Sequence, residues 1–235
     1  MGRSTAEQPR KTRGGHVPTG TSAQRRARTA DSATATAKSA QTRESLVDAA
    51  RTVFIRSGYM DARVRDIVDE ADVAHGSFYT YFPSKREIFQ EVVDQVGELI
   101  LHAVAHTSDD VPGDVLGNLE RANRRYLDVH RDNAAILALV DQVATADPVI
   151  LASRVQARRA HVNRIEATIE RLQERGVADP DLDVHTTAAS LVSMLSSCAH
   201  WYSIDPGDYD RDQLVHTLTQ IWARALGLEK AAAKP

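Results

Sequence analysis

The sequence has one cysteine among its 235 residues, Cys198, so a disulfide bond within the chain is excluded. No run of about 18 apolar residues occurs, and the sequence therefore predicts no membrane-spanning helix. The basic residues near the N-terminus are not followed by an apolar segment, so we expect no secretory signal. A lone cysteine fits a reducing compartment. We therefore expect a cytoplasmic protein in which Cys198 is a small buried helix residue rather than a redox switch.

The chain also lacks the motifs of nucleophilic catalysis. Ser193, Ser196 and Ser197 lie near His200 and Asp205 in the sequence. No Gly-x-Ser-x-Gly elbow or other nucleophile context accompanies these serines. We therefore assign no catalytic residue and do not expect an enzyme.

One pair of histidines has a spacing that metal ligands use. His102 and His106 are four residues apart, with Asp109 and Asp110 close behind them. Two imidazoles on one helix face could hold a zinc ion. A solvated helix end is the stronger interpretation of so polar a segment, so we expect neither a metal nor a cofactor.

The net charge of −3 hides an asymmetry along the chain. Residues 1–40 carry eight basic and two acidic groups (+6), whereas the remaining 195 residues carry 21 basic and 30 acidic groups (−9). Residues 1–40 also hold few apolar side chains, too few to offset the entropy lost on ordering, so we expect a disordered basic arm. A basic arm on an acidic body suggests a polyanionic partner near the N-terminus.

From Gln41 onward the apolar residues recur with helical spacing, and no useful length of β-type alternation appears. Hydrophobic residues make up 42% of the chain, enough for a packed core. Proline, glycine and Asp-Pro pairs separate the helical segments. The sequence therefore predicts an all-α protein of about nine helices. The expected helices are 42–57, 64–71, 75–81, one starting at Ser84, 114–130, 133–145, 148–175, 184–202 and 211–226.

Residues 64–85 have the pattern of a helix-turn-helix. Two short helices, 64–71 and 75–81, are expected to pack through Ile67, Val73 and Phe78. Asp72 lies at the bend between them, where a positive φ is often required. The outward face of the second helix would be polar and aromatic, as a recognition helix in a DNA major groove requires.

Hydroxyl, imidazole and guanidinium groups on and around this second helix are suited to contact phosphates and base edges. Small residues at its start would let the backbone approach DNA closely. The alternative is a small helical subdomain whose tyrosines are half-buried and which binds no nucleic acid. The predicted DNA contacts are Arg43, Arg63, Arg65, His75, Gly76, Ser77, Tyr79, Thr80, Tyr81, Ser84 and Lys85.

The segment from about Thr42 to Val93 resembles the N-terminal DNA-binding domain of the TetR family of bacterial transcriptional regulators. The resemblance is carried by Phe54-Ile-Arg-Ser-Gly-Tyr59, Val64-Arg-Asp-Ile67 and, above all, Gly76-Ser-Phe-Tyr-Thr-Tyr-Phe-Pro-Ser-Lys85. It implies that Ser77, Tyr79 and Tyr81 face DNA and that Lys85 binds a phosphate.

The sequence departs from the family pattern at two points in the helix-turn-helix. Asp72 stands where the family usually has Gly. Ala62-Arg63 stands where a Thr or Ser often caps the next helix, so Asp61 is the expected cap. Arg63 also adds a positive charge close to the DNA.

The helices from about residue 100 onward have apolar faces too broad for one partner, which indicates burial on several sides. We expect the last two helices to pair with their copies in a homodimer, because a two-headed protein matches palindromic DNA. The resemblance implies the same dimer. The predicted interface residues are Leu191, Leu195, Tyr202, Leu214, Leu218 and Trp222.

The resemblance also implies a ligand cavity in this part of the chain. Its candidate lining is apolar and aromatic, which favours an apolar or amphipathic effector over a sugar; the alternative for each of these residues is plain core. Four arginines could pair with the phosphates of an acyl-CoA-like molecule or could form a solvated face. The candidates are Leu99, Tyr126, Leu137, Val140, Met194 and Trp201 for the cavity, and Arg124, Arg125, Arg158 and Arg159 for the anion.

The sequence thus predicts a ligand-responsive regulator, a repressor that binds palindromic operator DNA as a dimer and is released by a small effector. The alternatives are an activator or architectural DNA binder without a ligand, and a helical carrier or enzyme with a non-functional head. The basic arm would follow the DNA or make no specific contact. The expected parts are a disordered basic arm (1–40), a helix-turn-helix DNA-binding domain (41–88), a helical ligand-binding and dimerisation domain (89–228) and a flexible tail (229–235).

Overall fold

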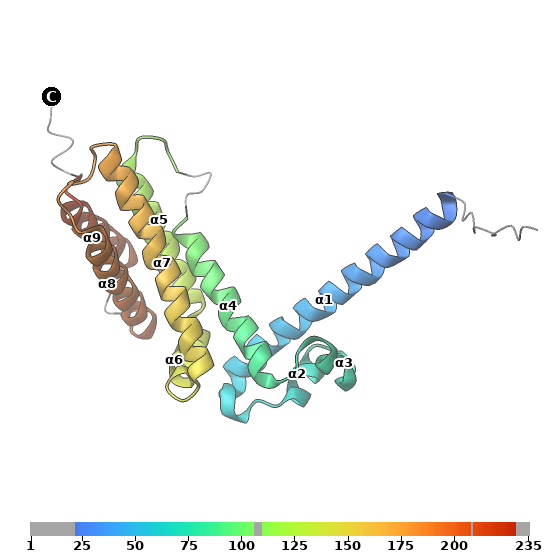
Figure 1. Cartoon of the computed structure of the whole chain (residues 1–235). Helices are drawn as coiled ribbons and strands as arrows, with labels where there is room; N and C mark the ends of the chain where they lie inside the picture. The colour runs from blue at the N-terminus through green and yellow to red at the C-terminus, as the bar shows by residue number, and fades with distance from the viewer. Residues whose placement is uncertain (1–21, 106–109, 208, 229–235) are drawn as a thin grey trace, which may run out of the picture. The chain divides into compact units, whose positions relative to one another are not determined.

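The computed structural model describes residues 22–105, 110–207 and 209–228, and within these ranges the regular structure is entirely helical (Figure 1). The prediction of an all-α fold is confirmed. None of the described helices is long and apolar enough to cross a lipid bilayer. The helices are α1 (Ser22–Asp61), α2 (Val64–Glu70), α3 (His75–Tyr81), α4 (Lys85–Ala103), α5 (Val115–Asp132), α6 (Ala134–Ala144), α7 (Pro148–Glu174), α8 (Val184–Ile204) and α9 (Arg211–Ala225).

The first helix begins much earlier in the chain than the sequence pattern predicts. Helix α1 starts at Ser22, whereas the expected start is Thr42. From Ser22 to Ser57 the chain has no proline or glycine, and alanine, the strongest helix former, recurs seven times between residues 22 and 40. Helix propensity therefore outweighs the shortage of apolar side chains. The described part of the expected disordered arm is helical, and residues 1–21 and the expected tail 229–235 lie outside the described residues.

The chain divides into two compact units, residues 1–42 and residues 43–235. The first unit is described only from Ser22 onward, where it is helical. The second unit contains both parts that concern function. These are the head, residues 43–84, and the body, residues 85–228. Helix α4 is continuous across residues 88 and 89, where the boundary between the DNA-binding domain and the ligand-binding domain is expected. The two expected domains therefore share one helix.

The head has the predicted helix-turn-helix. Helices α2 and α3 begin where expected, and α2 ends one residue early. Asp72 has a φ of 53° at the bend, as its position predicts. Asp61 is not the cap of α2, a correction: Arg63 occupies the N-cap position, and its backbone N–H donates to the Asp66 carboxylate at 3.1 Å. An acidic residue three positions inside the helix thus satisfies the exposed donor.

Aromatic packing joins α1 to α4. The rings of Phe54 and Phe89 meet edge to face with centroids 5.1 Å apart, and both side chains are fully buried. Tyr59, which follows the break in α1 at Gly58, packs 4.7 Å from Phe89. Gly58 has a φ of 74°, a conformation that residues with a side chain avoid, and this explains why the main run of α1 stops there as predicted.

Lys85 at the start of α4 locks this arrangement. Its ammonium donates to the carbonyl oxygens of Tyr59 at 2.7 Å, Met60 at 3.2 Å and Ala62 at 2.8 Å. These carbonyls follow a helix end and would otherwise lack donors. Ser84 is the N-cap of α4, and its side chain accepts from the Arg86 N–H at 3.2 Å. The position of α4 is thereby fixed against the head.

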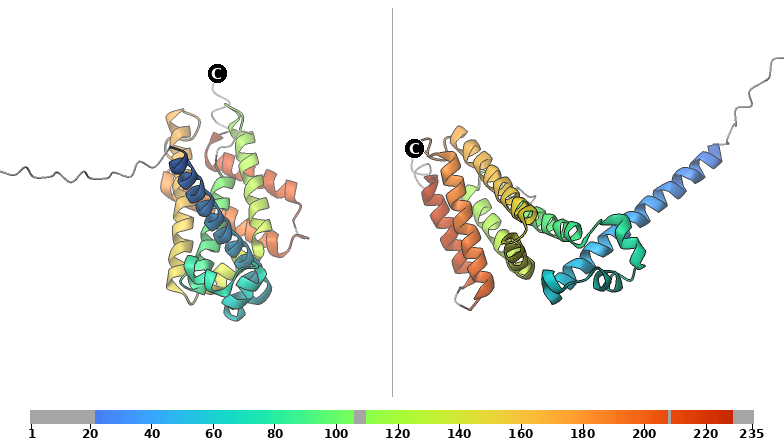
Figure 2. Two further views of the ribbon diagram at one scale, coloured as in Figure 1. Left: turned by 90° about the vertical axis from the view of Figure 1, so that its right-hand side faces the viewer. Right: turned by 60° about the horizontal axis from the view of Figure 1, so that its bottom comes forward.

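The body is a bundle in which α7 packs on α8, and α5 packs on both α8 and α9 (Figure 2). Gly97 brings α4 close to α7, since a side chain there would meet the Ala157 Cβ at 3.7 Å. The buried core of the bundle is centred on Leu127, Ile169 and Leu195.

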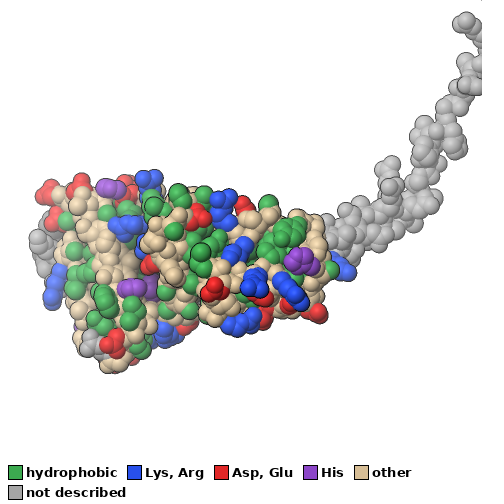
Figure 3. Space-filling model, turned by 90° about the horizontal axis from the view of Figure 1, so that it is seen from below, with side chains coloured by type: hydrophobic (Ala, Val, Ile, Leu, Met, Phe, Trp, Pro, Cys, Tyr) green, Lys and Arg blue, Asp and Glu red, His purple; other side chains and the backbone are tan. Residues whose placement is uncertain are grey.

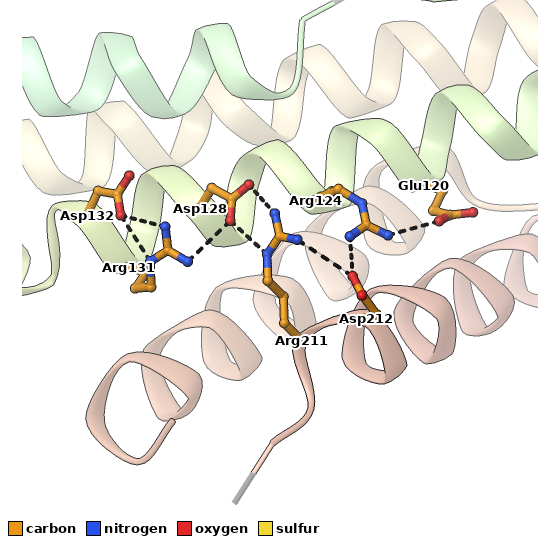
Figure 4. A network of polar contacts seen from close by, with 7 residues as sticks. All are labelled: Glu120, Arg124, Asp128, Arg131, Asp132, Arg211 and Asp212. Carbon is orange, nitrogen blue, oxygen red and sulfur yellow. Dashed lines mark hydrogen bonds and ion pairs between the residues drawn. The ribbon is translucent and has the colours of Figure 1, made fainter. Parts of the chain in front are cut away.

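Ion pairs tie the start of α9 to α5 (Figure 4). The Arg211 Nε donates to Asp128 at 2.9 Å, and Arg124 pairs with both Glu120, at 3.2 Å, and Asp212. Ion pairs with exposed partners contribute little to stability in water, so these pairs link the start of α9 to α5 without adding much to the stability of the bundle. The network consists of Glu120, Arg124, Asp128, Arg131, Asp132, Arg211 and Asp212.

Candidate functional site

One face of α3 presents polar groups to solvent. Tyr79 is 56% exposed, and His75, Gly76 and Thr80 are also exposed. The face stays outward because Phe78, on the opposite side of the helix, is fully buried in the head. A Cβ added at Gly76 would meet no atom within 4 Å, so the backbone there is open to a close approach. Hydroxyl and imidazole groups on an exposed helix after a tight turn can contact base edges and phosphates.

Two arginines extend this face. The side chains of Arg63 and Arg65 are exposed beside the start of α2. Arg65 has one weak ion pair, with Asp69 at 3.6 Å, and both partners are well solvated. A pair of this kind is worth little in water, so a phosphate can displace the carboxylate readily.

Arg43, by contrast, is used within the head. Its guanidinium donates to Glu91 at 2.7 Å and lies 5.0 Å from the centre of the Phe82 ring. The hydrogen bond from Arg43 lowers the pKa of Glu91. A phosphate would therefore have to compete with a carboxylate that is already in place, and Arg43 is a weaker candidate for a DNA contact than its sequence position indicates.

The expected phosphate contact of Lys85 is not supported by the structure. Its three N–H donors are directed at three carbonyls at the C-terminal end of α1, so the ammonium holds α4 on the head. Ser84 caps α4, Ser77 is partly exposed, and Tyr81 is partly buried against the head core. A sequence motif shows that these residues matter; it does not separate groups that touch DNA from groups that position the helix.

The described surface of the head is not uniformly basic. Figure 3 shows Lys and Arg side chains on this part of the molecule interspersed with Asp and Glu. The excess of positive charge in the sequence lies instead in residues 1–40. Sequence-independent attraction to DNA therefore cannot come chiefly from the head.

The body contains a cavity of about 560 Å³, within the size range of small-molecule sites. It lies among α4, α5, α6, α7 and α8. Its apolar wall comes from five helices, and its polar groups come mainly from α5, α7 and α8. The lining residues are Val93, Val96, Gly97, Ile100, Tyr126, His130, Leu137, Val140, Asp141, Leu151, Arg154, Val155, Ala157, Arg158, His161, Val192, Ser196, Ser197 and His200.

Four of these polar side chains form two hydrogen-bonded pairs and one stacked contact. The Tyr126 hydroxyl lies 2.9 Å from the Ser196 hydroxyl, and the His130 Nδ1 lies 3.1 Å from the Ser203 hydroxyl just outside the lining. The His161 ring stacks on Tyr126 with centroids 5.4 Å apart. Burial lowers the pKa of both His130 and His161 to about 4, so both imidazoles are neutral at neutral pH.

Two arginines from α7 complete the cavity. Arg154 forms an ion pair with Asp141 of α6 at 2.8 Å. Arg158 donates to the Ser193 hydroxyl at 2.9 Å and has no carboxylate partner among the described residues. The cavity thus combines an apolar wall with neutral hydrogen-bonding groups and one arginine available for an anion.

The sequence located part of this lining. Tyr126, Leu137 and Val140 line the cavity as expected. Leu99 and Trp201 are instead 44% and 54% exposed, and Met194 packs against the body core, so these three expectations are wrong. Helical periodicity identifies apolar faces without saying which face meets a void.

The four arginines considered for an anion separate in the structure. Arg124 is paired with Glu120 and Asp212, and Arg125 donates to two backbone carbonyls. Arg159 is exposed, and Arg158 alone lines the cavity. The histidines were missed, although His161 lies within the apolar stripe of α7 and a titratable residue at such a position is a usable signal. His106 and Asp109, considered above for a metal, lie outside the described residues.

The cavity and the head share side chains. Val93 and Val96 of α4 and Val140 of α6 line the cavity and also belong to the apolar cluster that contains Phe54 and Phe78 of the head. A hydrogen bond of 2.7 Å from Arg51 of the head to the Asn133 side chain adds a polar link. Packed cores respond to added volume by shifting as units. The cavity wall and the core that packs under α3 therefore belong to one apolar cluster.

The predicted dimer residues face the wrong way, a correction. Leu191, Leu195, Leu218, Trp222 and Tyr202 are buried within the single chain, and Leu214 packs against the same body core. Helices α8 and α9 are apolar on more than one side. Periodicity alone does not distinguish the side that faces the body core from the side that faces outward.

A different set of side chains forms the outer face of α8. Trp201 and Ile204, near the end of α8, are 54% and 58% exposed, and Ser190 in the same row of the helix is also exposed. Ser193 and Ser197 of this row lie at the cavity, where Ser193 accepts from Arg158 and Ser197 is part of the lining. On α9, Ile221 is 42% exposed. An exposed helix face with large apolar residues at one end is suited to close packing on another helix.

Two family models match the chain. Residues 46–92 match bacterial regulatory proteins of the tetR family, and residues 113–226 match the tetracyclin repressor-like C-terminal domain. The two matches together cover well over half of the chain and correspond to the head with the start of α4 and to the rest of the body.

Relatives of known name agree with this assignment. The uncharacterized HTH-type transcriptional regulator YdgC of Bacillus subtilis is 28% identical over 67% of this chain and 79% of its own. The HTH-type transcriptional repressor KstR2 of Mycolicibacterium smegmatis is 27% identical over 68% of this chain and 78% of its own.

Solved structures share the fold. A transcriptional regulator from Rhodococcus sp. superposes with a TM-score of 0.64 at 22% identity, covering 82% of this chain and 99% of that one. The fatty acid degradation regulator FadR from Bacillus halodurans superposes with a TM-score of 0.63 at 19% identity, covering 77% of this chain and 93% of that one.

The neutral, buried His161 predicts a pH dependence of stability. Between pH 6.5 and about 4 the unfolded chain binds a proton at this residue and the folded chain does not, so the free energy of unfolding falls as the pH falls. We expect His161 alone to lower it by about 3 kcal/mol at pH 4. Urea unfolding at several pH values measures this. His161→Leu should flatten the pH profile and the exposed-site control His102→Leu should not; identical profiles for all three proteins would contradict the prediction.

Proposed function

Because the chain belongs to the TetR family of bacterial transcriptional regulators, we propose that it is a homodimeric repressor whose α3 helices read operator DNA and whose cavity binds a small effector. The observation that carries the proposal is the set of side chains shared by the cavity wall and the head core, Val93, Val96 and Val140. It gives an effector a direct physical route to the DNA-reading helix.

The DNA contacts we propose are those that the structure leaves available. Tyr79, Thr80 and His75 of α3 would meet base edges or phosphates in the major groove, with Arg63 and Arg65 on the backbone. Ser77 and Gly76 would allow the helix to approach closely. Tyr81, Ser84, Lys85 and Arg43 would act mainly by holding α3 and α4 in place.

The effector would act by a population shift. A ligand that binds better to one arrangement of α4 and α6 favours that arrangement in proportion to its preference. If that arrangement separates the two α3 helices by a distance that does not fit the operator, the ligand weakens DNA binding, and the operator weakens ligand binding by the same factor.

The cavity supports an apolar or amphipathic effector. The apolar part of its lining is mainly valine and leucine, and Arg158 offers one site for an anionic group. An acyl-CoA-like molecule, considered on sequence grounds, would use this arginine alone of the four candidates.

The dimer would form through the outer faces of α8 and α9. Trp201, Ile204 and Ile221 are large apolar side chains that solvent exposes in the single chain. A two-fold dimer built this way presents two recognition helices, and half-sites would lie about 34–36 Å apart or at a multiple of that spacing.

We expect Tyr79→Ala with Thr80→Ala to weaken operator binding about tenfold to a hundredfold, because each lost hydrogen bond is worth about 0.5–1.5 kcal/mol. Thermal unfolding should be unchanged, since both side chains are exposed. Fluorescence anisotropy with duplexes from the upstream region of the gene measures affinity. Thr52→Ala, at an exposed position on α1, is the matched control and should bind operator DNA as the parent does. Parent-like affinity of the double variant would contradict the assignment of α3 as the DNA-reading helix. If no duplex binds specifically, the proposal that the protein is a DNA-binding regulator is contradicted.

The dimer assignment has its own test. Trp201→Glu with Ile204→Glu places two charges on the outer face of α8, and we expect the dimer to dissociate at micromolar concentration. Leu116→Glu, at a 43% exposed apolar position on α5, is the control and should stay dimeric. Analytical ultracentrifugation distinguishes the two states. A folded double variant that remains dimeric would place the interface elsewhere.

A further inference from the structure

The polar groups of the cavity follow one another along α7. Arg154, Arg158 and His161 are spaced by four and three residues, so they lie on one face of the helix. At 1.5 Å per residue, His161 lies about 4.5 Å further along the axis than Arg158 and about 10 Å further than Arg154. Between and beside them the wall is apolar, with Leu151 and Val155. Along this face, two charged side chains, Arg154 and Arg158, are followed by a neutral polar side chain, His161.

His161 has an unmet hydrogen-bonding capacity. Its side chain is 4% exposed, and its Nε2 atom has no hydrogen-bond partner among the described residues. Among the described residues that line this cavity, it is the one with a buried polar atom of this kind. A buried polar group without a partner costs about 1–3 kcal/mol, so its presence calls for a partner that the chain itself does not supply.

The neighbours of His161 do not fill this need. The Tyr126 ring stacks on the imidazole, and its hydroxyl is engaged with Ser196. His130 is engaged with Ser203. The depressed pKa of His161 keeps the ring neutral, so it can donate or accept one hydrogen bond to an uncharged oxygen without burying a charge. An oxygen atom of a bound molecule is the partner that fits.

We infer that the effector of this cavity is an amphipathic acid that carries a hydroxyl or similar hydrogen-bonding oxygen within its apolar part, its carboxylate at Arg158 and its oxygen at His161. The inference rests on the proposed function, since it names the ligand class of the same cavity. A plain hydrocarbon acid would bury apolar surface equally well but leave the imidazole unpaired. Selection against such acids would come from that unpaired group.

Dodecanoate and 3-hydroxydodecanoate are a matched pair of test ligands, because they differ by one hydroxyl close to the carboxylate, as the i, i+3 spacing of Arg158 and His161 requires. Isothermal titration calorimetry on the full chain, below the micelle concentration, gives the two dissociation constants. We expect 3-hydroxydodecanoate to bind about tenfold more tightly, the ratio that one satisfied buried hydrogen bond produces. Addition of 3-hydroxydodecanoate to the protein–operator complex should release DNA at lower concentration than dodecanoate does.

Three variants separate the contributions. His161→Leu should abolish the preference for 3-hydroxydodecanoate while keeping dodecanoate binding. His161→Gln, which retains a hydrogen-bonding side chain, should keep part of the preference and guards against a folding defect in the first variant. Arg158→Gln should weaken both acids by a similar factor and leave their ratio unchanged. His102→Leu, at an exposed position on α4, is the control and should behave as the parent in every measurement.

The outcomes divide cleanly. A preference for 3-hydroxydodecanoate that disappears in His161→Leu supports the inference. Equal binding of the two acids, a preference that survives in His161→Leu, or no binding of either acid to the parent overturns it; equal binding would mean that a water molecule already satisfies Nε2. Operator affinity without ligand is measured in parallel. If it is intact while the preference is absent, this inference alone fails, and if the parent binds no specific duplex, the proposed function fails.

Discussion

One apolar cluster belongs both to the wall of the cavity and to the core of the head, and the proposed response of the protein to a ligand depends on it. Val93 and Val96 on one side of α4, with Val140 of α6, touch both the cavity and the packed core of the head. Dense packing transmits small displacements, because a core has no empty space in which to absorb them. Had the cavity been separated from the head by an independent layer of side chains, occupancy would have no direct route to the recognition helix.

The head converts this packing into a defined orientation of α3. Phe54, Phe89 and Tyr59 form an aromatic contact between α1 and α4, and the ammonium of Lys85 binds three carbonyls at the C-terminal end of α1. These contacts fix α4 to the head. The residues left outside them, Tyr79 and Thr80 above all, are free to meet another molecule.

The sequence predicted the fold well and the sites unevenly. Helix boundaries were accessible because they depend on local signals such as the Ser84 cap, Gly58 and the Asp-Pro pairs. The early start of α1 was missed because composition was weighed by apolar content rather than by helix propensity. The roles of Lys85 and of the inner residues of α8 and α9, such as Leu195, could not be read from periodicity, because a motif residue or an apolar face has the same spacing whether it meets DNA, a partner, a cavity or the core. His161 shows the same limit, since only the three-dimensional packing reveals that its Nε2 lacks a partner.

The central claim is that volume added to the cavity weakens operator binding through the shared cluster, and it can be tested without any ligand. Leu137→Trp enlarges a partly buried side chain that lines the cavity and packs on the head cluster, whereas Leu116→Trp enlarges an exposed one on α5. Operator affinity of both variants, measured on protein shown to be folded and dimeric, decides the matter. The account predicts affinity at least about tenfold weaker for Leu137→Trp, since about 1.4 kcal/mol of coupling suffices, and parent-like affinity for Leu116→Trp. A folded, dimeric Leu137→Trp protein that binds the operator as tightly as the parent would contradict it.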